Sequence, residues 1–186
     1  MPVKGARVVV RTTDTGDFQI EPVVQSVIMG GFAQVIYMIS EDLLREAVGR
    51  ANIKTGLLRS TGNVRLEDQE VVAMELSNAI KSGPTKSGKL RAGRVYVGKK
   101  ENPTTVAIRA MQQAKTSSTF KFVVGFATPY ARYIHQSDRW TKLGPRSLRA
   151  NSGGKFKGRV GKYYLTRAWD DNQSRYFSFL DRTFRR

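Results

Sequence analysis

The only histidine of the chain lies among residues that could support acid–base chemistry. Residues 128–140 read TPYARYIHQSDRW, which places His135 between Tyr133 and Asp138. An imidazole beside a carboxylate titrates near neutral pH and could act as a general base. A serine nucleophile would have to use this histidine, yet the sequence contains no G-x-S-x-G motif. We therefore expect a structural role, in which the ring packs at a helix end or hydrogen-bonds to a backbone carbonyl.

Two acidic clusters and one glycine-rich stretch resemble binding sites in composition alone. Glu67, Asp68 and Glu70 stand close together, as do the two aspartates at residues 170–171. Carboxylates can hold a hard metal ion, but clusters of this kind are also typical of solvated faces, which we favour. Residues 83–88, GPTKSG, lack the G-K-[ST] ending of a phosphate-binding loop. The sequence thus predicts no enzyme, including no metal-dependent nuclease, and no bound cofactor or metal.

The net charge of +17 is concentrated in the later part of the chain. Residues 1–70 carry a net charge of −1, whereas residues 71–186 carry +18. Between Arg139 and Trp169 there are nine basic residues and no acidic one. Such a charge drives copies of the chain apart unless an anionic partner neutralises it. Nucleic acid and the acidic surface of another protein both fit, and composition does not distinguish them.

Length and composition limit the class of protein. The 186 residues suit one domain, and a hydrophobic content of 40% is enough for a core. The absence of cysteine excludes disulfides and thiolate metal sites. No apolar run approaches the ~20 residues that span a bilayer, and Val8-Val9-Val10 is too short for a signal peptide. We expect a soluble protein without a membrane segment or a classical secretion signal.

Helical periodicity is clearest near the two ends of the chain. Apolar residues recur at three- and four-residue steps over residues 32–50, which predicts a long N-terminal helix. Residues 40–42, SED, could instead cap a second helix within this range. Residues 163–184 predict an amphipathic C-terminal helix. Shorter helical segments are expected over residues 106–114 and, as a helix or a turn, over residues 130–136.

Strands are expected between these helices. Residues 95–98, VYVG, and residues 120–125, FKFVVG, each read as a short strand that ends at a glycine. Residues 71–80 fit either a helix or a strand. The sequence therefore predicts an α+β fold, in which the strands of a small mixed or antiparallel sheet follow the N-terminal helix along the chain and precede the C-terminal helix.

The chain is expected to divide into an arm and one domain. Residues 1–19 predict an N-terminal arm, and residues 20–186 a single domain with extended loops. Within the domain, residues 141–162 are expected to form a basic loop, which would follow phosphates or dock onto an acidic neighbour. Aromatic residues near the loop, such as Trp140, could stack on bases or fill a protein interface, and we favour the interface.

Four short motifs follow the first helix in an order that resembles a known family. They are TGLLRS at residues 55–60, VYVG at 95–98, TPYARYIH at 128–135 and YLTRA at 164–168. This order resembles the neck proteins of tailed bacteriophages, the tail-completion or head–tail joining family, often labelled minor capsid protein or putative tail component. The resemblance covers residues 32–186 as scattered motifs. His135 stands where the family usually has a glutamate, and Ser137-Asp138 replaces a G-T turn.

The resemblance implies a structural protein of the virion. It implies a homo-oligomeric ring of six or twelve copies around the DNA channel, which joins the portal or connector of the head to the tail. The protein would be assembled in the cytoplasm of the bacterial host and would reside in the neck, with non-specific contact to genomic DNA as a possibility. Tail completion, stopper and tail terminator remain open as subtypes. A basic nucleic-acid-binding protein is the alternative from another class.

The residues expected to shape the subunit or to make contacts come from the motifs, the basic loop and the last helix. The motif residues are Thr55, Gly56, Leu58, Tyr130, Tyr133 and His135. The remaining residues are Trp140, Arg149, Lys155, Lys157, Arg159 and Trp169. Among them, the two tyrosines of the TPYARYIH motif and its histidine are expected to form a structural corner.

Overall fold

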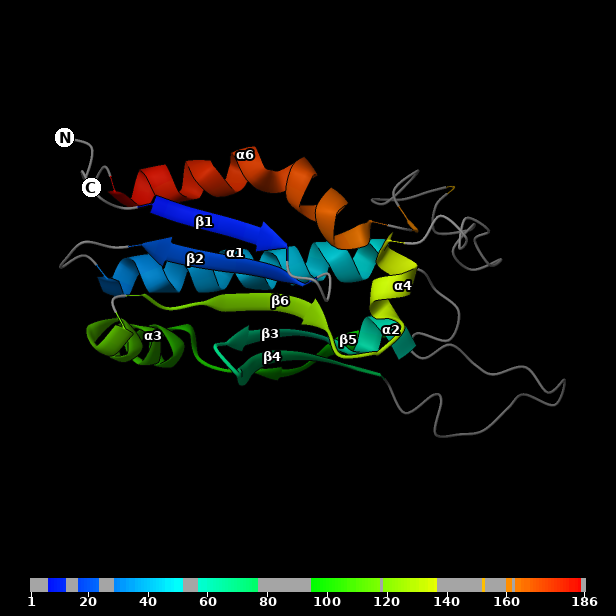
Figure 1. Ribbon diagram of the computed structural model, residues 1–186, viewed down its shortest axis with the longest axis horizontal. Coiled ribbons are helices and arrows are strands. Elements are labelled where there is room, and N and C mark those ends of the chain that lie inside the picture. Colours follow the sequence, from blue (N-terminus) through cyan, green and yellow to red (C-terminus); the bar gives the residue numbers. More distant parts are fainter. Residues whose placement is uncertain are drawn as a thin grey trace, which may run out of the picture.

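The computed structural model describes residues 7–12, 17–23, 29–51, 57–76, 95–117, 119–136, 152, 160–161 and 163–184 (Figure 1). The strands are β1 (Arg7–Thr12), β2 (Phe18–Val23), β3 (Gly62–Leu66), β4 (Gln69–Leu76), β5 (Val95–Lys100) and β6 (Phe122–Phe126). The helices are α1 (Met29–Arg50), α2 (Leu57–Ser60), α3 (Pro103–Ser117), α4 (Ala131–Gln136) and α6 (Tyr164–Phe184). The predicted α+β class is confirmed.

The six strands form one sheet in the order β1-β2-β6-β3-β4-β5, and each of its neighbouring strand pairs is antiparallel. β6, which comes late in the sequence, lies between β2 and β3. Its sequence FVVGF is buried throughout, as a central strand requires. The sheet is therefore built from segments far apart in the chain and depends on long-range pairing.

Three helices cover one face of the sheet, with α1 between α6 and α3 (Figure 1). The apolar face of α1 supplies Phe32, Ile36 and Leu43 to a core that it shares with the inner sides of β2, β3 and β6. Gly62 on β3 lets the helix come close, because a Cβ there would lie 2.9 Å from a Leu44 methyl carbon. The opposite face of the sheet carries several polar side chains, among them Gln19, Asn63 and Arg65.

The predicted N-terminal arm is wrong for the residues of this region that the structure places. β1 pairs with β2 from Arg7↔Val23 to Thr12↔Phe18, so residues 7–12 and 18–19 belong to the sheet. The run of β-branched valines favours a strand, and Val10 packs against the core. The first two strands therefore form a hairpin that extends the sheet, rather than an arm outside the domain.

The long helices agree with the sequence, and the short elements agree less well. α1 runs unbroken through residues 40–42, where Ser40 donates a hydrogen bond to the Ile36 carbonyl within the helix (2.9 Å) instead of capping a second one. Residues 71–76 form a strand, which resolves the open choice for this segment. β3 and α2 were not predicted. No helix of the described ranges is long and apolar enough to cross a membrane.

Candidate functional site

Three of the four motifs meet at one end of the molecule, which we call the motif end. It consists of the last turn of α1, α2, α4 and the first turn of α6, and these lie together on the right of Figure 1. The motif end therefore brings together residues 57–60, 128–135 and 164–168. The fourth motif contributes to β5, which pairs with β4 at the edge of the sheet.

Arg59 of α2 binds the C-terminal end of α1. Its Nε donates to the Ala51 carbonyl (2.9 Å), and its Nη2 donates to the carbonyls of Gly49 (2.8 Å) and Ala51 (2.7 Å). These carbonyls have no partner within the helix, so the guanidinium caps α1. Burial lowers the pKa of Arg59 to about 10, which leaves the group charged at neutral pH. Leu58 beside it is buried in the core.

Tyr164 joins α4 to the start of α6. Its buried ring makes edge contacts with the rings of Phe126 (4.9 Å between centroids) and His135 (4.8 Å). Its hydroxyl donates to the Ala131 carbonyl (3.2 Å), and burial raises the pKa of this hydroxyl. The Tyr163 backbone N–H donates to the His135 carbonyl (2.9 Å), with Tyr163 in the left-handed region at φ 56°. This junction fixes the direction in which α6 leaves the motif end.

His135 is a packed residue of this junction. Its ring is 3% exposed, Nε2 lies 3.3 Å from the Thr166 hydroxyl, and Nδ1 bonds to none of the residues that the structure describes. Burial lowers the pKa of the imidazole to about 4, so the ring is neutral at physiological pH. A buried ring of this kind has little access to a substrate. The geometry therefore favours the structural role expected from the sequence.

The pH dependence of stability tests this placement. The folded protein keeps His135 neutral down to about pH 4, whereas the unfolded chain takes up a proton near pH 6.5. The unfolded state thus binds more protons in this window, and stability falls as the pH falls. Between about pH 6.5 and about pH 5 we expect a loss of about 1.5 kcal/mol in the free energy of unfolding. Urea titrations of the wild type and of His135→Phe should show the loss only in the wild type. An equal loss in the variant would contradict the assignment.

The other predicted residues of this region differ in placement. Tyr130 is 38% exposed and Tyr133 is 67% exposed, so neither forms the buried corner with His135. Trp169 packs beneath the sheet, with its ring centroid 6.3 Å from that of Phe18 and 5.8 Å from that of Tyr176. Thr55, Gly56, Trp140, Arg149, Lys155, Lys157 and Arg159 lie outside the described residues.

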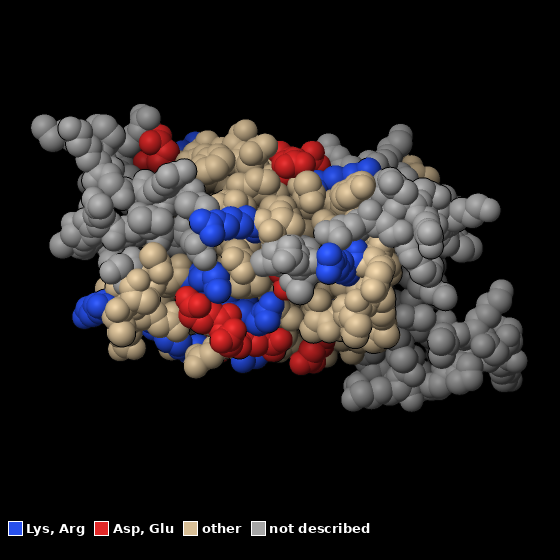
Figure 2. Space-filling view, in the orientation of Figure 1, with Lys and Arg blue, Asp and Glu red and all other residues tan. Residues whose placement is uncertain are grey.

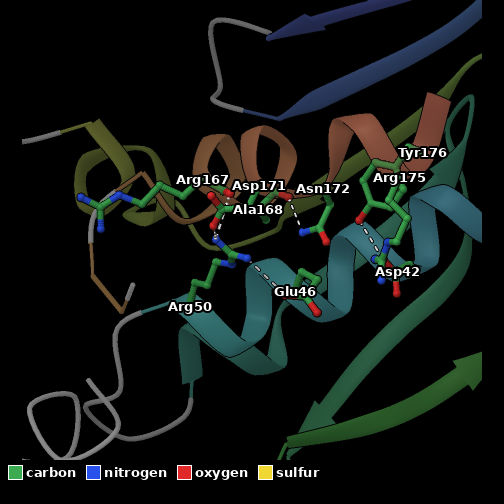
Figure 3. A network of polar contacts seen from close by, with 9 residues as sticks. All are labelled: Asp42, Glu46, Arg50, Arg167, Ala168, Asp171, Asn172, Arg175 and Tyr176. Atoms are coloured by element: carbon green, nitrogen blue, oxygen red, sulfur yellow. Dashed lines mark hydrogen bonds and ion pairs between the residues drawn. The ribbon is translucent and has the colours of Figure 1, made fainter. Parts of the chain in front are cut away.

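A row of polar contacts joins α1 to α6 (Figure 3), and we call it the α1–α6 seam. It was not predicted from the sequence. Arg50, 2% exposed, donates to the Arg167 carbonyl (2.9 Å), to Glu46 (3.3 Å) and to Asp171. Further along the same antiparallel helix pair, Asp42 accepts bonds from Arg175 and from the Tyr176 hydroxyl (2.8 Å). The i,i+4 spacing of Glu46 and Arg50 was the one visible signal.

This seam corrects the expected role of one acidic cluster. Asp171 is not merely a solvated carboxylate, because it forms an ion pair with Arg50 across the helix interface. Asp170 beside it is exposed. Glu67 of the other cluster lies 3.8 Å from the Lys121 ammonium group and accepts the Lys121 backbone N–H (2.9 Å). Each cluster therefore contains a carboxylate that binds a residue of another part of the fold, Asp171 in one and Glu67 in the other.

Two depressions on the described part of the surface have the size to receive a partner. A polar one of about 610 Å³ lies on the sheet face away from the helices, where Asp17 pairs with Arg65 (3.0 Å) above Gly125. An apolar one of about 600 Å³ lies between α1 and α6, and exposed Met38 and Phe179 line it. The polar depression is lined by charged side chains that pair with one another, as Lys121 does with Glu67. Among the described residues there is no group of three or more potential metal ligands.

Comparisons of the chain with family models, curated proteins and solved structures find no match.

Proposed function

We propose that the protein is a structural component of the bacteriophage neck, which joins the head connector to the tail as a ring around the DNA channel. Tail completion is the favoured subtype, and tail terminator is the alternative within this class. The role requires a stable subunit with surfaces for neighbours and no catalytic centre. Its partners would be further copies of the chain, the portal or connector, and tail proteins.

The observation that carries the proposal is the convergence of the motifs. Residues 57–60 contact the end of α1 through Arg59, residues 164–168 contact it through the Arg167 carbonyl, and residues 128–135 pack on Tyr164 through His135. Three of the motifs on which the resemblance rests thus lie together at one end of the subunit, which supports the proposal. This end shapes the subunit, which supports a role in assembly.

The described surface also supports association with other proteins. Large apolar side chains are exposed on the helix layer at Met38, Phe179 and Ile108 (56%, 45% and 52%). On α1 and α6, two of these border the apolar depression. Exposed apolar patches of this kind commonly mark protein interfaces. A basic nucleic-acid-binding protein remains the second candidate, and the net charge of +17 favours it.

The oligomeric state of the isolated chain tests the proposal. With repulsion between highly charged copies and no partner to neutralise it, we expect a monomer or a weak association, with rings forming only when head or tail proteins are added. Chemical cross-linking and sedimentation velocity across a range of protein concentrations measure this. Stable two-fold dimers at every concentration, unchanged by added partners, would count against a ring component.

A further inference from the structure

The polar depression on the sheet face away from the helices is lined by two buried polar atoms that lack hydrogen-bond partners. Asn63 on β3 is 6% exposed, and its Oδ1 accepts no hydrogen bond from the residues that the structure describes. Two positions further along the same strand, Arg65 Nε is buried and donates to none of them. Both side chains line the depression. Because a buried polar atom without a partner costs stability, two of them at one hollow point to a ligand that satisfies them.

The other polar atoms of these two side chains hold them in place. Asn63 Nδ2 donates to the Thr61 carbonyl (3.3 Å), and Arg65 Nη2 donates to the Asp17 carboxylate (3.0 Å). Asp17 itself lies directly over Gly125 of β6, where a Cβ would overlap with its carboxylate. The depression therefore contains one acceptor and one donor on anchored side chains, about 7 Å apart along the strand.

The charges around the depression do not select a charged ligand. Three acidic and three basic residues line it, and their charges sum to zero: Asp17, Glu67, Asp68, Arg65, Lys121 and Arg132. Ion pairs join Asp17 to Arg65 and Glu67 to Lys121. Acidic and basic side chains lie next to one another on this face of the molecule (Figure 2). An anion would meet as many like charges as opposite ones, whereas an uncharged polar ligand has no charge to balance.

The depression is elongated along β3. From Asn63 it follows the strand to Glu67 at the β3–β4 turn, which corresponds to about 13 Å of extended chain. At the other end, Thr128, Pro129 and Arg132 border it. A hollow that runs along a strand for this length suits an extended chain better than a compact molecule.

We propose that the polar depression binds an extended, uncharged polypeptide segment of a neighbouring protein. A backbone N–H of the segment donates to Asn63 Oδ1, and a backbone carbonyl accepts from Arg65 Nε. In an extended chain, equivalent groups recur on one side every two residues, which is the spacing of Asn63 and Arg65. The Arg65 side chain is 36% exposed, so small rotations of its guanidinium and of the Asn63 amide bring both atoms to the hollow. Contacts to main-chain groups give affinity with little dependence on sequence.

This proposal rests on the proposed function and deepens it. A neck subunit has to hold segments of its neighbours, and the depression assigns that contact to the sheet face rather than to the helix layer. The chemistry that recognises the partner is the peptide group itself.

An NMR titration of the full chain with a capped, uncharged peptide, acetyl-GSTSG-amide, tests the proposal. The signals to follow are the Nε–H of Arg65 and the side-chain amide of Asn63. Gln113 on α3 is the internal control, because its Oε1 is also buried without a partner among the described residues but lies outside the depression. We expect saturable shifts of the Arg65 and Asn63 signals with millimolar peptide and none of the Gln113 signal. No shift at any peptide concentration, or an equal shift at Gln113, would overturn the proposal.

Two variants, Asn63→Leu and Gln113→Leu, form a matched pair. Each replaces a side-chain amide by an apolar side chain of similar size. In Asn63→Leu the Thr61 carbonyl still accepts the Ala127 N–H (3.0 Å), and thermal unfolding verifies that both variants fold. Loss of one hydrogen bond should weaken peptide binding about fivefold in Asn63→Leu, while Gln113→Leu should match the wild type. Peptide binding by Asn63→Leu as tight as that of the wild type would contradict the assignment.

Maltose and inorganic phosphate are titrated in the same way. Shifts of the Arg65 and Asn63 signals with maltose but not with the peptide would overturn the proposal in favour of a carbohydrate ligand. Tighter binding of phosphate than of the peptide would overturn it in favour of an anion. Binding of the peptide alone supports it.

Failure of this proposal can be told from failure of the proposed function. Peptide binding at the depression by a chain that never joins a phage particle would keep the site and remove the neck role. A ring of this chain in the neck whose polar depressions contain no segment of a neighbour would keep the role and remove the site.

Discussion

Replacing Arg50 by methionine is expected to lower the free energy of unfolding by about 3 kcal/mol, because the change leaves a buried charge without its partner. The Arg50 side chain is 2% exposed and bonds to Glu46, Asp171 and the Arg167 carbonyl. Glu46 is itself buried at 5% exposure. Methionine fills most of the volume, so the loss reports on charge and hydrogen bonding more than on a cavity. Urea unfolding measures the difference.

Two further variants control this experiment. Arg175→Met removes a cation from the same seam, but Arg175 is 47% exposed, so we expect a loss below about 1 kcal/mol. Adding Glu46→Gln to Arg50→Met removes the charge of the buried carboxylate that has lost Arg50 and should restore part of the stability. An Arg50→Met protein as stable as the wild type would show that the seam does not hold α1 to α6.

Replacing Tyr164 by alanine is expected to cost about 4 kcal/mol, because it empties a site at the centre of the motif end. The ring is 1% exposed and lies between Phe126 and His135. Tyr164→Phe is the matched control, since it keeps the ring and removes only the hydrogen bond to the Ala131 carbonyl, at about 1 kcal/mol. Thermal and urea unfolding measure both changes.

Comparing the stability lost in Tyr164→Ala with that lost in Tyr164→Phe separates the contribution of ring packing from that of the hydrogen bond. A large loss for alanine with a small loss for phenylalanine means that ring packing holds α4 against α6. If the two losses are equal and small, the junction contributes little to stability, and the motifs do not form one unit. The argument from motif convergence would then fail.

The elements with strong periodicity could be predicted from the sequence. α1 and α6 repeat apolar residues every three or four positions, which reflects burial along one helix face. β6 has a continuous apolar run, which fits a central strand. For these segments, local pattern and tertiary environment agree. The α+β class follows from them.

β3 could not be predicted because its residues make contacts with segments that are far away in the sequence, and they leave no local strand pattern. Gly62 is needed for the close approach of α1, and Asn63 and Arg65 point to the polar face of the sheet. None of these three residue types favours a strand, so the strand exists through pairing with β4 and β6.

The candidate site was predictable in its parts but not in its arrangement. The motifs and the buried role of His135 could be read from the sequence, since a lone histidine without a nucleophile suggests packing. The exposure of Tyr133 could not be predicted from the sequence, and neither could the ion pair between Arg50 and Asp171. That pair joins residues 121 positions apart, so no local pattern records it.

Electron cryomicroscopy of phage particles that contain this chain tests the central claim most directly. The account predicts a ring of copies between the head connector and the tail, with a fold that matches the six-stranded sheet and its three covering helices. A fully tailed particle whose junction contains no density for this fold, while the chain occurs elsewhere, would contradict the account.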